Sequence, residues 1–179
     1  MNAHVSVSRA ALCAVLTIPL LCACGRGRAP APAAALPPPP AAPYPAAVRL
    51  YYDNGGGIQD SMRLVIKDAA ALQRVWENAT SRQNSPPAAP TVDFGRDMLA
   101  VIAAGRMTPD DQVRVDSVAV TRRMNAAGRM EEVLNIFVRT TTGCRRFNAD
   151  AYPLEIIRLK RFEGTIEFIE RRDQAEGCR

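Results

Sequence analysis

Met-Leu-Ala-Val-Ile-Ala-Ala, residues 98–104, is continuously apolar and is followed by Gly105. An apolar run of this length is typical of a strand buried on both faces, because helices are usually longer. The stretch therefore predicts a core strand, and the segments before and after it are expected to supply its neighbours.

Further strands are predicted on both sides of this stretch. Upstream, Val48–Tyr52 and Met62–Ile66 are short apolar-rich runs separated by the turn-forming cluster Asn54–Gly57. Downstream, Val113–Thr121 and Val133–Thr140 lie on either side of a turn-like sequence at residues 125–128. This arrangement predicts an antiparallel hairpin.

The first strand of that hairpin changes phase. Val113 and Val115 alternate in one register, whereas Val118 and Val120 alternate in the other. A bulge or bend is therefore expected near residues 116 and 117.

A last hairpin is predicted near the C-terminus. Leu154–Lys160 and Thr165–Glu170 would pair around a turn at Glu163 and Gly164. Pro153 would then stand at a strand start, where its missing N–H costs least.

One helix is predicted between residues 68 and 80. Asp68 is a suitable N-cap, and an apolar stripe at helical spacing is formed by Leu72, Val75, Trp76 and Ala79. The stripe favours Trp76 as a core anchor over a sugar-stacking platform.

These elements together predict an α+β fold that is mainly antiparallel β. About seven strands would form a curled sheet or a sandwich, with the helix packed on it. Residues 48–179 are long enough to form a single domain with its own core.

Residues 1–23 have the layout of an export signal. A short polar start containing Arg9 precedes an apolar stretch that ends in Leu21, Cys22 and Ala23. The stretch holds roughly 12 to 14 apolar residues, fewer than the ~20 that a transmembrane helix needs. We therefore expect a cleaved signal peptide.

Cys24, after the small Ala23, is typical of a bacterial lipoprotein processing site. Lipid chains on this cysteine (palmitate among them) would give near-permanent membrane anchoring, since each buried methylene contributes ~0.8 kcal/mol. Gly25 in place of Asp is typical of lipoproteins of the outer membrane. The expected location is the cell envelope, facing the periplasm or the cell surface.

Residues 24–47 form an Ala/Pro-rich tether after the lipidated cysteine. Proline favours extended polyproline II, so the tether would reach up to roughly 70 Å at ~3.1 Å per residue. A ligand for a proline-recognising domain is the alternative interpretation.

His4 is the only histidine and lies in the predicted signal peptide. The mature chain then lacks the usual base of Ser–His and Cys–His pairs and the commonest metal ligand. We expect no enzyme activity, no cofactor and no metal centre. The basic residues are dispersed without interleaved aromatic residues, which argues against nucleic-acid binding.

Cys144 and Cys178 are the cysteines that remain once the signal is removed and Cys24 carries lipid. Export to an oxidising compartment favours a disulfide between them. The alternative is a reactive thiol at Cys144, whose pKa would be lowered by Arg145 and Arg146.

Asp110, Asp111 and Gln112 are the candidate partner-binding residues. They follow Thr108 and Pro109 in a predicted loop. A calcium site is disfavoured because the D-x-D-x-D-G spacing is absent, so the pair of acids is interpreted as a solvated turn.

The order of elements resembles the PrcB-like family of envelope proteins. The resemblance covers most of residues 58–172, through the helix with Trp76, Val92–Gly95 before the apolar strand, the long hairpin and the segment Pro153–Ile157. It implies a non-enzymatic subunit that supports a secreted or surface protease complex.

Three functions follow in order of preference. The first is a lipid-anchored module that binds and stabilises an envelope protein, with a protease subunit as one partner. The second is a small-ligand-binding or envelope-stress lipoprotein. The third is an acid-only hydrolase that would use Asp93, Asp110 or Asp111.

Overall fold

The computed structural model describes residues 42–145 and 147–178. The predicted signal peptide, the lipidation site at Cys24 and most of the tether lie outside these residues. No helix in this part of the chain has the length and apolar character required to span a membrane.

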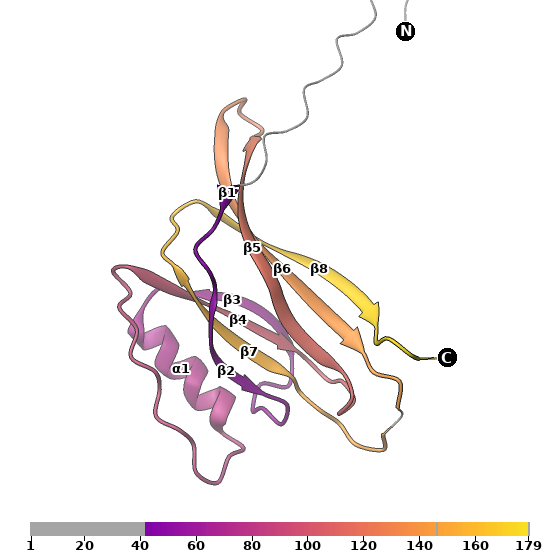
Figure 1. Ribbon diagram of the computed structural model, residues 1–179. Coiled ribbons are helices and arrows are strands. Elements are labelled where there is room, and N and C mark those ends of the chain that lie inside the picture. The colour runs from indigo at the N-terminus through magenta and orange to yellow at the C-terminus, as the bar shows by residue number, and fades with distance from the viewer. Residues whose placement is uncertain (1–41, 146, 179) are drawn as a thin grey trace, which may run out of the picture. The chain divides into compact units, whose positions relative to one another are not determined.

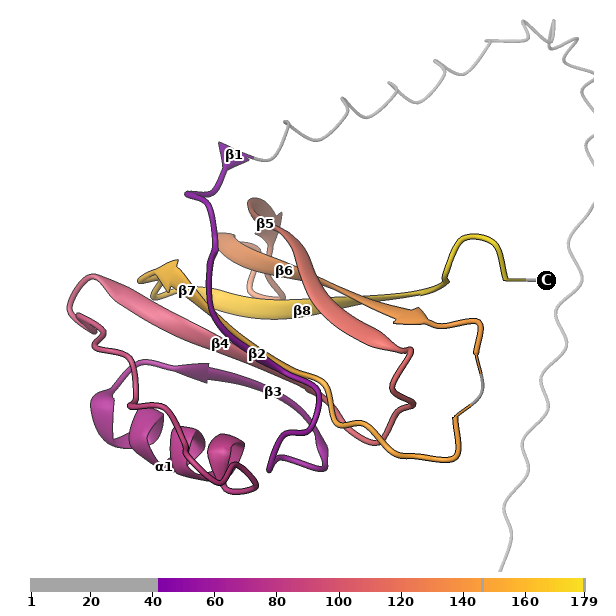
Figure 2. The ribbon, with the colours of Figure 1, turned by 60° about the horizontal axis from the view of Figure 1, so that its bottom comes forward.

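The described domain has three layers: one helix and two four-stranded sheets (Figures 1 and 2). The central sheet has the order β2-β7-β4-β3, and the outer sheet has the order β1-β5-β6-β8. The helix α1 covers the face of the central sheet that points away from the outer sheet. The predicted α+β class, mainly antiparallel with one helix, is confirmed.

The elements have the following bounds: β1 Ala42–Pro43, β2 Val48–Asp53, β3 Ser61–Ile66, α1 Ala69–Thr80, β4 Asp97–Ala104, β5 Gln112–Met124, β6 Met130–Thr142, β7 Leu154–Lys160 and β8 Thr165–Gln174.

The stretch at residues 98–104 forms β4 in the middle of the central sheet, between β7 and β3. Its side chains alternate between two cores. One core lies against α1 and includes Leu99 and Val101, and the other lies between the sheets and includes Met98 and Ile102. The prediction of a strand buried on both faces is confirmed.

The hairpin of β5 and β6 is confirmed, together with its bulge. The register shifts between Val115 and Ser117, where β5 has one residue more than β6. Because of this extra residue, both valine pairs of β5 face the core between the sheets: Val113, Val115, Val118 and Val120.

The predicted hairpin between residues 154–160 and 165–170 is wrong. β7 pairs with β2 and β4 in the central sheet, whereas β8 lies parallel to β6 in the outer sheet. The reason is burial. β7 has apolar side chains on both faces and therefore lies in the central sheet, whereas β8 has one buried face and lies in the outer sheet. Phe162 packs between the sheets, so the short connection carries the chain from one sheet to the other.

The helix forms as predicted. The Asp68 carboxylate accepts a hydrogen bond from the Ala71 N–H at 2.7 Å, and the helix ends at Thr80. Trp76 is 6% exposed, and its indole N–H donates to the Pro87 carbonyl at 2.8 Å. Trp76 is therefore a core residue, as the apolar stripe predicted.

Two carboxylates join the sheets at their opposite edges. Glu155 on β7 is buried and accepts hydrogen bonds from the Val115 N–H and from Nε of Arg49, each at 2.6 Å. At the other edge, Arg63 on β3 binds both carboxylate oxygens of Glu170 on β8, at 2.6 and 3.1 Å. The Glu155 side chain is 2% exposed, whereas that of Glu170 is 42% exposed.

This difference in burial predicts unequal stabilities for two matched variants. Glu155→Ala should lower the free energy of unfolding by about 2–4 kcal/mol, because the Val115 N–H loses its acceptor and a cavity forms. Glu170→Ala should cost at most about 1 kcal/mol, as expected for an exposed ion pair. Urea unfolding followed by circular dichroism measures both. Equal losses would show that burial at Glu155 does not determine sheet packing.

Candidate binding face

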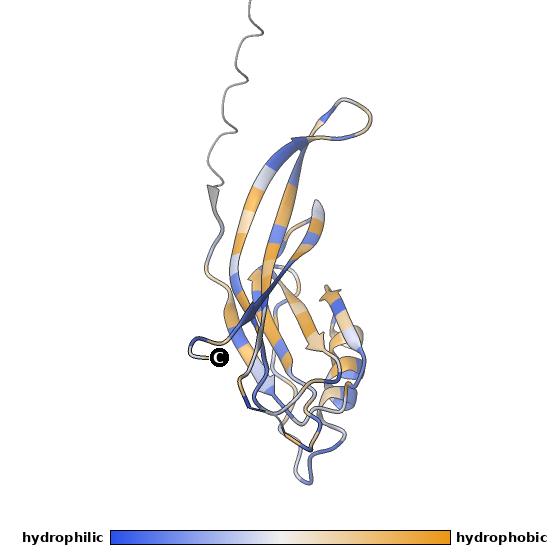
Figure 3. Cartoon of the chain, turned by 90° about the vertical axis from the view of Figure 1, so that its right-hand side faces the viewer, coloured by the Kyte–Doolittle hydropathy of each residue, from blue (hydrophilic) through white to orange (hydrophobic). Residues whose placement is uncertain are grey.

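The outer surface of the outer sheet is the candidate functional site. On β6, Leu134, Ile136 and Val138 face the core between the sheets, so Val133, Asn135 and Phe137 face outward. Among the described residues, no helix or sheet covers this surface (Figure 2). The alternation of hydrophilic and hydrophobic residues along the long strands is visible in Figure 3. We call this surface the outer face.

An apolar row crosses the middle of the outer face. Its apolar members are Phe137 on β6 and Ile169 on β8, which are aligned by the strand register. Ser117 on β5 continues the row at its other end. Phe137 is half-buried, and Ile169 is 39% exposed. Apolar side chains therefore reach solvent at the centre of a surface that is otherwise polar.

Ion pairs lie on the side of this row nearer the hairpin tip. Arg123 on β5 binds Glu131 at 2.9 Å and Glu167 on β8 at 2.7 Å. By the strand register, the line from Arg123 to Glu167 crosses β6 near Val133, which is 1% exposed. These charged side chains thus cover an apolar residue, and they are already paired with one another.

A polar hollow of about 560 Å³ lies on the other side of the row. Arg139 binds Asp116 at 2.6 Å and lies 3.7 Å from Asp173. The hollow is lined by Asp110, Gln112, Arg114, Asp116, Arg139 and Glu176, among others. Two of the three predicted contact residues, Asp110 and Gln112, therefore lie at the margin of the outer face.

Asp111, the third of these residues, points away from the hollow and is buried. Its carboxylate accepts hydrogen bonds from the N–H groups of Thr108 and Gly143, both at 2.9 Å. The interpretation of this pair of acids as a solvated turn is therefore wrong for Asp111. It joins the start of β5 to the end of β6.

Asp110 holds the neighbouring turn. Its carboxylate accepts from the Arg145 N–H at 3.0 Å and from the Arg145 guanidinium at 3.1 Å. These hydrogen bonds hold the pKa of Asp110 below its ordinary value of 3.8, with the backbone N–H as the largest cause. A side chain at Gly143 would place its Cβ 2.5 Å from Asp110, so glycine is required for this close approach.

The same corner contains the predicted disulfide. Cys144 and Cys178 are bonded, with their Cα atoms 4.9 Å apart and a sequence separation of 34. In the structure the bond ties the C-terminal tail after β8 to the turn after β6. The alternative of a free reactive thiol at Cys144 is excluded by this pairing.

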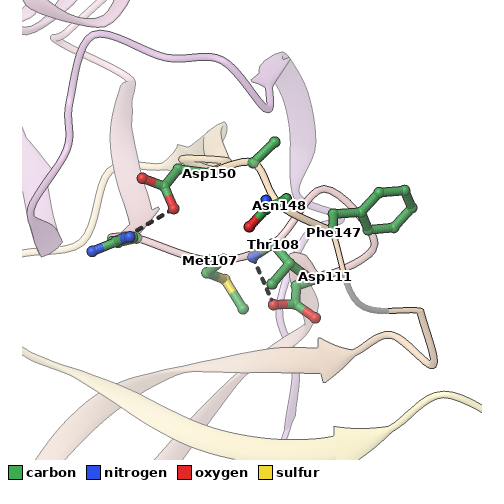
Figure 4. Close-up of a pocket in the computed structure, with 8 residues that line it drawn as sticks. Met107, Thr108, Asp111, Phe147, Asn148 and Asp150 are labelled. Carbon is green, nitrogen blue, oxygen red and sulfur yellow. Dashed lines mark hydrogen bonds and ion pairs between the residues drawn. The ribbon is translucent and has the colours of Figure 1, made fainter.

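Another hollow, of about 670 Å³, lies outside the outer face (Figure 4). It is formed by the loop at residues 106–111 and the loop at residues 147–150. Arg106 binds Asp150 at 2.8 Å across it, and Asp111 is held by Thr108. Arg106 and Asp150 are therefore paired with each other, Asp111 is held by backbone N–H groups, and none of the three is positioned as a free acid or base.

The acids suggested for hydrolysis make similar backbone contacts. Asp93 accepts a hydrogen bond from the Gly95 N–H at 3.0 Å, as Asp110 and Asp111 do from other backbone groups. Within residues 42–145 and 147–178, no group of three or more Asp, Glu, Cys or His side chains is arranged to hold a metal ion.

Comparisons of the chain with protein-family models, with curated proteins and with solved structures found no match.

Sequence reasoning did not identify the apolar row. The alternation at Leu134, Ile136 and Val138 indicated the core face of the strand, but Phe137 lies in the opposite phase. An aromatic residue on the solvent side of an alternating strand was the signal that could have marked the outer face.

The lowered pKa of Asp110 predicts a specific dependence of stability on pH. A carboxylate with a depressed pKa stabilises the fold above its unfolded value, and this contribution is lost as the pH falls through the folded value. Asp110→Asn should therefore reduce the loss of stability on acidification below pH 3.8. Thermal unfolding at a series of acidic pH values measures this.

Asp60→Asn is the matched control. Asp60 is exposed, and its carboxylate accepts no hydrogen bond within the described part of the chain. This variant should follow the wild type at every pH. An Asp110→Asn profile parallel to the wild type would rule out a stabilising role for the Asp110 carboxylate.

Proposed function

We propose that the chain is a lipid-anchored protein of the cell envelope that binds a partner protein and has no catalytic activity of its own. The observation that carries this proposal is the apolar row of Phe137 and Ile169 on the uncovered outer face. The outer face would be the contact surface.

The composition of this face favours protein binding. Protein interfaces commonly have an apolar, often aromatic, centre within a polar and charged rim. Phe137 and Ile169 provide such a centre, and the ion pairs of Arg123 and Arg139 lie on either side of it. Because these charges are paired before binding, their side chains are already ordered, which lowers the entropic cost of association.

The proposed anchor complements a binding role. A lipidated Cys24 would restrict the domain to one membrane surface, and the Ala/Pro-rich tether would allow it to search for partners nearby. Tethering raises the effective concentration of the domain for membrane-bound partners without adding contacts.

The resemblance to the PrcB-like family suggests the class of partner. It supports a proposal in which the domain stabilises a protease complex at the cell surface or in the periplasm. Asp110 and Gln112, which line the hollow beside the outer face, would contribute to the rim of that contact.

A small-ligand-binding lipoprotein is the second candidate. The observation that favours it is the hollow of about 670 Å³ at residues 106–111 and 147–150, where the Phe147 side chain is exposed. A bound lipid or metabolite that copurifies with the native protein would support this alternative.

The binding proposal predicts different effects for two matched substitutions. Ile169→Glu places a charge in the apolar row and should weaken partner capture at least about tenfold, which corresponds to 1.4 kcal/mol. Val48→Glu changes a residue of similar exposure, 43% against 39%, in the central sheet and should leave capture unchanged. Tagged full-length wild type and both variants are solubilised from their own membranes and captured. Quantitative mass spectrometry then compares the proteins recovered with each.

A protein recovered with the wild type and Val48→Glu, but not with Ile169→Glu, is the expected result. Recovery of a protease subunit would identify the partner class. Equal recovery with all three proteins would contradict binding through the outer face.

A further inference from the structure

The tip of the β5–β6 hairpin carries the two most exposed large apolar side chains among the described residues. Met124 is 68% exposed and Met130 is 62% exposed. They are direct cross-strand partners, so they lie side by side where the hairpin projects beyond the rest of the domain (Figures 1 and 3). Two neighbouring methionines at a projecting tip form a compact apolar surface that none of the described residues covers.

The turn that joins these methionines is well ordered. The Asn125 side-chain oxygen accepts hydrogen bonds from the N–H groups of Ala127 and Arg129, both at 3.0 Å. Gly128 has a φ of 71°, which glycine adopts without strain. The tip is therefore held in one shape and would lose little conformational entropy on contact.

The charges near the tip have a definite pattern. Arg122 binds Glu132 at 3.0 Å and Arg123 binds Glu131 at 2.9 Å, just below the methionines. Arg129, in the turn itself, has no carboxylate partner within residues 42–145 and 147–178. The tip thus presents apolar side chains together with one unpaired positive charge, a combination that suits an anionic headgroup layer.

The start of the described chain lies at the same end of the domain. Ala42 in β1 pairs with Val120 in β5, four residues before Met124. At ~3.4 Å per residue, Val120 lies about 14 Å from Met124 at the tip and about 27 Å from Gln112 at the other end of β5. Because β1 is antiparallel to β5, its N-terminal end points toward the tip.

We propose that the hairpin tip, Met124–Met130, contacts the headgroup layer of the membrane in which the protein is anchored. This inference rests on the lipid anchor at Cys24 that forms part of the proposed function. The 18 residues from Cys24 to Ala42 would reach at most about 56 Å at the polyproline II rise, so the tether limits how far the tip can move from the bilayer. With the tip in contact, the long strands of the outer face rise away from the bilayer, and this face is turned toward neighbouring membrane-bound proteins.

The test places a fluorescent label at the tip of the full-length mature protein. Ala127→Cys is labelled with the disulfide intact, and the protein is reconstituted through its own lipid into vesicles of phosphatidylethanolamine and phosphatidylglycerol. A nitroxide on the lipid headgroups quenches the label only at short range. Gln59→Cys is the control, since Gln59 is exposed in the loop after β2, at the other end of the domain.

The expected result is loss of most of the fluorescence at residue 127 and none at residue 59. The double change Met124→Asp and Met130→Asp should abolish quenching at residue 127 while the protein stays on the vesicles. Equal quenching at both labelled positions, or quenching that survives the double change, would overturn the proposal. A second measurement uses iodide, a quencher dissolved in water. A label at residue 127 that is unquenched in vesicles but shielded from iodide in native membranes would indicate a protein contact at the tip and would also overturn the proposal.

Failure of the anchor gives a different result. A protein without lipid would not float with the vesicles, and this would contradict the proposed function before any label is measured. A protein that floats but shows no quenching at residue 127 would retain its anchor and contradict only the contact of the tip.

Discussion

The buried carboxylate of Glu155 joins the central sheet to the outer sheet, and the rest of the structure depends on this contact. It lies on β7, accepts a hydrogen bond from the Val115 N–H at the bulge of β5, and binds Arg49 of β2. A buried carboxylate is costly unless its oxygens are hydrogen-bonded, and both oxygens of Glu155 are engaged. The central sheet and the outer sheet are thereby fixed in one relative position at this edge.

This packing determines which surface remains open. The central sheet is covered by α1 on one side and by the outer sheet on the other, so β4 and β7 have no free face. Among the described residues, the outer sheet is covered on one side only. The apolar row of Phe137 and Ile169 is therefore left exposed, and the binding proposal rests on this surface. The long β5–β6 hairpin continues past the edge of the sandwich and carries the methionine pair beyond it.

Local patterns in the sequence were sufficient for much of this structure. The apolar run at 98–104, the stripe with Trp76 and the phase change in β5 each depend on neighbouring residues, and all three predictions are confirmed. The cysteine pair followed from a count, because two cysteines remained once the others were assigned. The predicted hairpin of β7 and β8 is wrong because strands distant in sequence pair with them instead: β2 and β4 with β7, and β6 with β8.

The candidate site was less accessible to sequence reasoning. Asp111 was expected in solvent, but it is buried by a contact with Gly143, 32 residues away, that no local pattern indicates. The adjacent Asp110 and Gln112 were chosen for their loop position, and the structure places them beside the outer face. Phe137 and Ile169 become neighbours only through the parallel pairing of β6 with β8. A site formed by such pairing emerges from the topology rather than from a motif.

We propose that the β domain is held at a membrane by lipid on Cys24, and the covalent state of that residue is the most direct test. Mass spectrometry of the N-terminal peptide from the native protein should show a chain that begins at Cys24 and carries fatty acyl groups. An N-terminal peptide that begins upstream of residue 24, or an unmodified Cys24 in membrane-extracted protein, would contradict the account.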